Sequence, residues 1–131
     1  MTDIRILVVD DEPDIREVVD VSLGLDREFK MRACASGADA LVMAAEWSPT
    51  LILLDVMMPL MDGPATLASL RKNPRTAHIP VVFLTARTQA DEIEQYIALG
   101  AQGVLSKPFN PMTLAASVRS YLTSPAGHQA L

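Results

Sequence analysis

The feature that most constrains the fold is an unbroken apolar run, Leu51-Ile52-Leu53-Leu54, that ends at a carboxylate, Asp55. A strand with one face in water alternates apolar and polar residues, whereas a continuous run is typical of a strand covered on both faces. Asp55 is then expected at the carboxyl end of that strand. This is the edge at which open parallel sheets bind their ligands.

Short apolar runs alternate with longer amphipathic segments along the whole chain. Strands are predicted at 4–9, 31–35, 51–54, 81–84 and 103–106. Helices are predicted at 13–25, from a cap at Ser36 to Pro49, at 63–72, at 89–99, and from a cap at Asn110 to residue 123. This alternation predicts an α/β fold, a doubly wound parallel five-stranded sheet with helices on both faces.

Charged residues follow three of these strands. Asp10 and Asp11 follow the first strand, Asp55 the third and Lys107 the fifth. Right-handed crossovers cover both faces of a sheet only if the strand order reverses once, and we expect the first and third strands to flank that point. The pattern therefore predicts one shared site for a metal ion and a phosphoryl group.

Length and composition narrow the class of protein. With 131 residues, half of them hydrophobic, one folded domain is expected. The net charge of −5 argues against direct binding to nucleic acid. Cys34 is the only cysteine, so no internal disulfide forms, and no apolar stretch approaches the length that spans a membrane. We therefore expect a cytoplasmic protein without a membrane or nucleic-acid partner.

Four motifs, in this order, resemble one known family. They are Val8-Val9-Asp10-Asp11-Glu12-Pro13, Leu54-Asp55-Val56-Met57-Met58-Pro59 with Met61-Asp62-Gly63, Leu84-Thr85-Ala86, and Ser106-Lys107-Pro108-Phe109. Together they resemble the receiver domains of bacterial two-component response regulators. The resemblance implies a flavodoxin-like fold with strand order 2-1-3-4-5, a receiver domain over residues 1–123, and a disordered or frayed tail over 124–131.

The resemblance also implies a role for each site residue. Asp55 matches the phosphate-accepting aspartate, Lys107 the lysine that contacts the phosphoryl oxygens, and Thr85 the hydroxyl residue that moves onto the phosphoryl group. For Mg²⁺, Asp11 matches the direct ligand, Asp10 a ligand acting partly through water, and Met57 the residue whose carbonyl binds the ion, beside Asp55. The Lys107–Pro108 bond is expected to be cis.

The implied function is a phosphorylation-dependent signalling module. Asp55 would accept a phosphoryl group, with Mg²⁺, from a phosphohistidine of a sensor histidine kinase or a histidine phosphotransfer protein. The surface of the fourth helix, the fifth strand and the fifth helix would then switch and bind an unknown downstream protein. The module would catalyse only its own phosphoryl transfer and a slow dephosphorylation. Relatives often carry an aromatic residue where this chain has Val104, so the usual aromatic half of the switch is absent.

Two other functions stay open at this point. One is a Mg²⁺-dependent phosphatase of the haloacid-dehalogenase type, although such enzymes usually carry Asp-x-Asp after the first strand. The other is a degenerate receiver that only binds partners. Glu12 either extends the acidic site or is a solvated acid at a helix start, and Asp62 is interpreted as structural. The sequence also leaves open a stand-alone protein or a receiver cut from a longer regulator.

Overall fold

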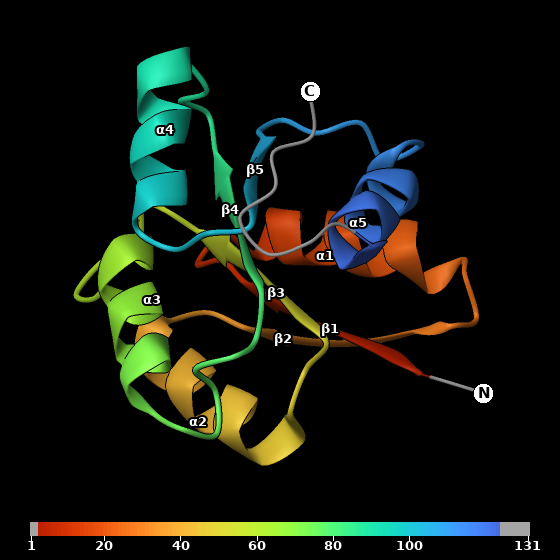
Figure 1. Ribbon diagram of the computed structural model, residues 1–131. Helices are drawn as coiled ribbons and strands as arrows, with labels where there is room; N and C mark the ends of the chain where they lie inside the picture. Colours follow the sequence, from red (N-terminus) through yellow and green to blue (C-terminus); the bar gives the residue numbers. More distant parts are fainter. Residues whose placement is uncertain (1–2, 124–131) are drawn as a thin grey trace.

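A computed structural model describes residues 3–123 as one parallel sheet wrapped by helices (Figure 1). The five strands lie in the order β2-β1-β3-β4-β5, and all paired strands are parallel. The elements in chain order are β1 (Ile4–Val9), α1 (Pro13–Gly24), β2 (Phe29–Cys34), α2 (Gly37–Trp47), β3 (Leu51–Asp55), α3 (Gly63–Lys72), β4 (Val81–Thr85), α4 (Ala90–Ala98), β5 (Gly103–Ser106) and α5 (Leu114–Thr123). The predicted flavodoxin-like fold and strand order are confirmed.

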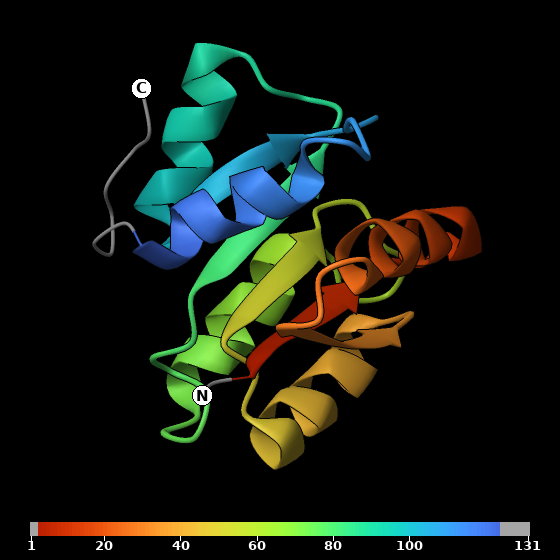
Figure 2. The same cartoon turned by 90° about the vertical axis from the view of Figure 1, so that its right-hand side faces the viewer.

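Helices cover both faces of the sheet (Figures 1 and 2). Helices α1 and α5 lie on one face, and α2, α3 and α4 lie on the other. The side chains of a strand alternate between the two faces, so the central strands feed two separate apolar clusters. In β3, Leu51 and Leu53 pack toward α1 and α5, whereas Ile52 and Leu54 pack toward α2 and α3. All four are fully buried, as the continuous apolar run predicts.

Several helices begin at the residues predicted from the sequence, because those residues favour a helix start. Pro13 is the first residue of α1, a position at which the missing amide hydrogen of proline is no loss. The Ser36 hydroxyl accepts a hydrogen bond from the Asp39 amide and caps α2. Asp62 caps α3 in the same way, because its Oδ1 accepts from the amide of Ala65 at 2.9 Å. The structural interpretation of Asp62 is therefore confirmed.

Two predicted boundaries are wrong. Strand β2 begins at Phe29 rather than at residue 31, because pairing with β1 extends the strand to the register Ile4 with Phe29. Helix α5 begins at Leu114 and not directly after Asn110. The Asn110 side chain accepts from the Met112 amide and its carbonyl from the Thr113 amide, so Asn110 closes a turn that precedes the helix.

The predicted tail at residues 124–131 lies outside the described residues. Within residues 3–123, none of the helices combines the length and apolar character that crossing a membrane requires.

Candidate functional site

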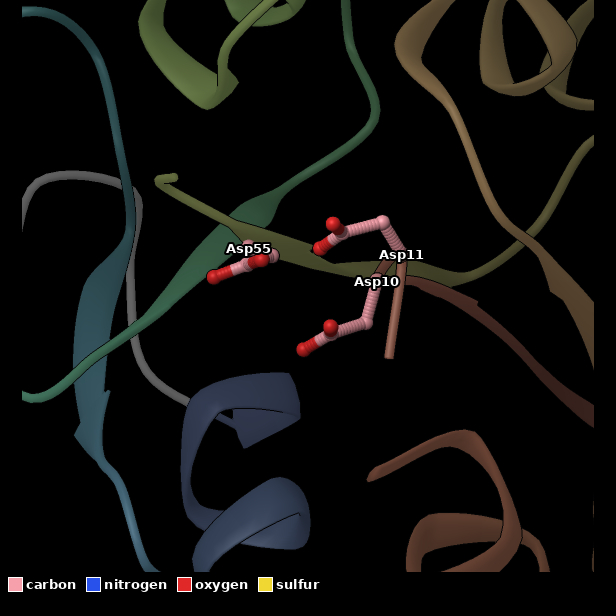
Figure 3. Close-up of side chains that lie close together, drawn as sticks. All are labelled: Asp10, Asp11 and Asp55. Atoms are coloured by element: carbon pink, nitrogen blue, oxygen red, sulfur yellow. The ribbon is translucent and has the colours of Figure 1, made fainter. Parts of the chain in front are cut away.

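Three carboxylates gather at the carboxyl ends of β1 and β3 (Figure 3). Asp55 is the last residue of β3, and Asp10 and Asp11 follow directly after β1, the neighbouring strand. One oxygen from each carboxylate lies within 4.8 Å of the others. Asp10 is fully buried, Asp55 is 4% exposed, and Asp11 faces solvent. Two of three clustered acids are thus largely removed from water.

The Lys107 ammonium enters this cluster from the end of β5. Its Nζ lies 3.0 Å from Asp55 Oδ1, 2.7 Å from Asp10 Oδ2 and 3.4 Å from Glu12 Oε1. The contact with Asp10 is an ion pair by distance, yet this buried oxygen receives no properly aligned hydrogen bond from residues 3–123. One ammonium therefore faces more negative charge than it can neutralise. The bond between Lys107 and Pro108 is cis, as the resemblance implied.

Backbone contacts fix the two acid-bearing loops. After β1, Asp10 Oδ1 accepts from the Glu12 amide at 2.9 Å, and Arg16 Nη1 donates to the Asp10 carbonyl at 2.8 Å. After β3, the Val56 amide donates to the Leu84 carbonyl of β4 at 3.1 Å. These bonds tie the backbone next to Asp10 and Asp55 to neighbouring elements, so these two buried acids are held in position before any ligand binds.

Crowding and burial change the protonation of this site. Burial raises the pKa of Asp55 from 3.8 to about 6; the Asp10 charge adds to this rise, and the Lys107 hydrogen bond opposes it. Burial alone would lower the pKa of Lys107, but its close contacts with the Asp10 and Asp55 carboxylates raise it. The lysine therefore stays charged at neutral pH, and Asp55 is held in an environment that disfavours its negative charge.

The donor set fits a hard divalent cation. Mg²⁺ is bound in proteins by one or two carboxylates, with waters and phosphate oxygens completing the octahedron. The clustered oxygens of Asp10, Asp11 and Asp55 supply such ligands, and Asp10 Oδ2 is a buried oxygen without an aligned hydrogen-bond donor within the described part of the chain. A divalent cation here would relieve the repulsion among the three acids.

Two further predicted site residues lie beside the cluster. The Met57 amide donates to Asp55 Oδ1 at 3.4 Å, and the Met57 side chain is exposed. Thr85, at the end of β4, is buried, and its hydroxyl accepts from the Arg87 amide at 3.0 Å. Within residues 3–123, Thr85 makes no side-chain hydrogen bond to Asp55 or Lys107. Its backbone carbonyl accepts from the Lys107 amide at 2.9 Å, so the two residues are backbone neighbours.

The structure adds Arg16 to the predicted site residues and places Glu12 beside them. Arg16 holds the Asp10 carbonyl, a contact that the sequence analysis missed. The available signal was a cation in the first part of a helix, where the helix dipole favours acids. Glu12, whose interpretation stayed open, is exposed but approaches Lys107 at 3.4 Å. It therefore touches the site from the solvent side.

Comparisons with known proteins agree with this geometry. The family model for the response regulator receiver domain matches residues 6–119. The chain is 40% identical over 119 residues to the response regulator Rre1 of Synechocystis sp., covering 91% of this chain and 52% of Rre1. It is 42% identical over 117 residues to the response regulator PleD of Caulobacter vibrioides, covering 88% of this chain and 25% of PleD. The chain thus spans about half or less of these relatives.

Solved structures show the same similarity. The chemotaxis response regulator CheY4 of Vibrio cholerae superposes with a TM-score of 0.84 at 32% identity. That match covers 92% of this chain and 99% of the CheY4 chain. A response regulator structure from Desulfuromonas acetoxidans gives a TM-score of 0.77 at 31% identity, covering 90% of this chain and 95% of the other.

Proposed function

Because the chain belongs to the response regulator receiver family, we propose that it receives a signal as a phosphoryl group on Asp55. The donor is a phosphohistidine of a sensor histidine kinase or a histidine phosphotransfer protein, and Mg²⁺ is the cofactor. The observation that carries this proposal is the convergence of Asp10, Asp11 and Asp55 within 4.8 Å, with Lys107 3.0 Å from Asp55.

Asp55 is the nucleophile in this proposal. A carboxylate oxygen forms a bond to phosphorus while the bond from phosphorus to the histidine nitrogen breaks, and the leaving imidazole keeps that electron pair. The product is an acyl phosphate on Asp55. With its pKa raised only to about 6, Asp55 is mainly ionised at neutral pH and able to attack.

Neighbouring residues stabilise the charge that the phosphoryl group carries. Lys107 already lies 3.0 Å from Asp55 and donates to the phosphoryl oxygens, a kind of contact whose loss costs about 3 kcal/mol of barrier. Asp10, Asp11, Asp55 and the Met57 carbonyl hold the cofactor. Bound Mg²⁺ supplies positive charge against the carboxylates and the phosphoryl oxygens.

The charge on phosphorylated Asp55 also drives a conformational change, and dephosphorylation reverses it. A phosphoryl group on Asp55 offers new acceptor oxygens, and the Thr85 hydroxyl turns toward them from its bond with the Arg87 amide. The surface formed by α4, β5 and α5 then changes and binds a downstream protein partner. In a slow reaction that the module itself catalyses, water attacks phosphorus, the bond from phosphorus to the Asp55 oxygen breaks, and inorganic phosphate and the free Asp55 carboxylate are released.

Phosphorylation by a small donor tests this function directly. The purified chain is incubated with Mg²⁺ and acetyl phosphate, and intact mass spectrometry is expected to show one added phosphoryl group that hydroxylamine removes. Asp55→Asn should abolish the label. Asp62→Asn is the matched control, since Asp62 lies in the same loop but caps α3; it should keep the label. Unchanged labelling of Asp55→Asn would refute the assignment.

A further inference from the structure

We propose, on the basis of the function proposed above, that Tyr96 is the positioning residue that makes α4 respond to Asp55. Its ring contacts Phe83, and Phe83 lies against the loop that carries Asp55. The aromatic ring that connects the site to α4 is therefore a residue of α4 itself, because β5 has Val104 at the neighbouring position.

Phe83 lies beside Gly63, the residue at which the loop that carries Asp55 ends and α3 begins. It is fully buried on β4, two residues before Thr85 and on the same face of the sheet. A Cβ placed on Gly63 would lie 3.0 Å from Phe83 Cε1, 2.5 Å from the Asp55 carbonyl oxygen and 2.8 Å from Val56 Cα. Three segments meet where only glycine leaves room. Because the Gly63 amide donates to the Val56 carbonyl at 2.9 Å, a movement of the Asp55–Val56 backbone would reach Gly63 and, through it, the Phe83 ring.

Tyr96 is the residue of α4 whose ring contacts Phe83. Its ring centroid lies 5.2 Å from that of Phe83, with the two planes tilted by 59°. Helix α4 contains no fully buried residue, so its attachment to the sheet depends on half-buried side chains, and Tyr96 is the largest of them. A helix held this way shifts easily when its main contact changes.

Val104 explains why the link runs through α4. In the register of β4 and β5, Val104 is the direct neighbour of Phe83. Val104 and Tyr96 both pack against the cluster that contains Phe83, on the face covered by α4 (Figure 1). A small residue at 104 leaves the space beside Phe83 to a ring from α4. A larger residue at 104 would compete with Tyr96 for it.

A second connection moves α4 in the same event. The Thr85 hydroxyl accepts from the Arg87 amide, which lies in the short loop between β4 and α4. When Thr85 turns to a phosphoryl group, it releases or pulls that loop. The start of α4 is thus displaced by Thr85 and its middle is held by Tyr96 on Phe83, so the Tyr96 contact determines how far the helix moves.

Nuclear magnetic resonance on the full chain tests this link. Amide shifts are recorded with and without Mg²⁺ and beryllofluoride, a mimic of the acyl phosphate, in wild type and three variants. Tyr96→Leu removes the ring, Tyr96→Phe keeps it, and Ile97→Ala trims a half-buried neighbour on the same helix as a matched control. The readout is the ligand-induced change at residues 90–98 relative to that at residues 55–57.

The expected result separates coupling from simple loosening of α4. Tyr96→Leu should keep the changes at 55–57 and lose most of those at 90–98, whereas Tyr96→Phe and Ile97→Ala should retain both. If Tyr96→Leu transmits the change as fully as wild type, or if Ile97→Ala loses it equally, the link through Tyr96 is refuted. Wild type without any change at 55–57 would overturn the proposed function and this inference together.

Discussion

Neutralising Asp55 should stabilise the protein in the absence of a divalent cation. The pKa of Asp55 rises from 3.8 to about 6 on folding, mainly because the carboxylate is buried. The folded chain therefore binds this proton more tightly than the unfolded chain does. Between these two values the folded state holds more protons, and the free energy of unfolding falls as pH rises.

The size of the effect follows from the same shift. Each unit of pKa difference corresponds to about 1.4 kcal/mol, so above pH 6 ionised Asp55 costs at most about 3 kcal/mol. Asparagine has nearly the same shape and no charge. In Asp55→Asn, Lys107 keeps Asp10 as a partner at 2.7 Å, so the lysine is not left buried and unpaired. We expect a gain of roughly 1–3 kcal/mol at neutral pH.

Urea unfolding measures this gain, with Trp47, the only tryptophan, as fluorescent reporter. Wild type and Asp55→Asn are unfolded in the presence of a chelator between about pH 4 and pH 8, a range that contains the titration. The stability difference should grow with pH and level off above about 6. Asp20→Asn, an exposed acid on α1, controls for the change in net charge. A variant less stable than wild type at neutral pH, or a difference independent of pH, would contradict the reasoning.

Substitutions at three other positions test local features. Leu60 is fully exposed with φ of 70°, a conformation that strains a bulky residue, so Leu60→Asn should stabilise by up to about 1 kcal/mol in urea unfolding. Gly103→Ala should destabilise by about 1–3 kcal/mol, because its Cβ would lie 2.1 Å from Tyr121 Cε1; a melting temperature equal to wild type would argue against this contact. Arg16→Met removes the hydrogen bond to the Asp10 carbonyl and should weaken Mg²⁺ binding severalfold in calorimetry, while Arg16→Lys should restore part of it. Equal Mg²⁺ affinity in both Arg16 variants and wild type would contradict a role for Arg16 in the site.

Sequence periodicity was sufficient for the central sheet but not for its margins. The apolar run Leu51–Leu54 of β3 and the proline at the start of α1 carry their own signals, so the positions of these elements were predictable. The beginning of β2 depends on pairing with β1, a contact between chain segments that no local pattern contains. Asn110 has the chemistry of a helix cap, yet it closes a turn before α5, because a capping side chain serves both structures.

The candidate site shows the same division. The acids and Lys107 were predictable as a group, because parallel strands deliver their carboxyl ends to one edge. The hydrogen bond from Arg16 to the Asp10 carbonyl and the ring contact between Phe83 and Tyr96 depend on how the helices pack on the sheet. Neither could be inferred from spacing, since a half-buried arginine or tyrosine on a helix has several possible neighbours.

The long chain separation within the site has a consequence for synthesis on the ribosome. Lys107 reaches Asp10 and Asp55 only from the last strand, across 52 residues from Asp55. A nascent polypeptide that has emerged only as far as α4 contains Asp10, Asp11 and Asp55 but lacks Lys107 and the edge strand β5. In the proposed function, the complete site therefore forms only late in translation, after β5 and Lys107 have been synthesised.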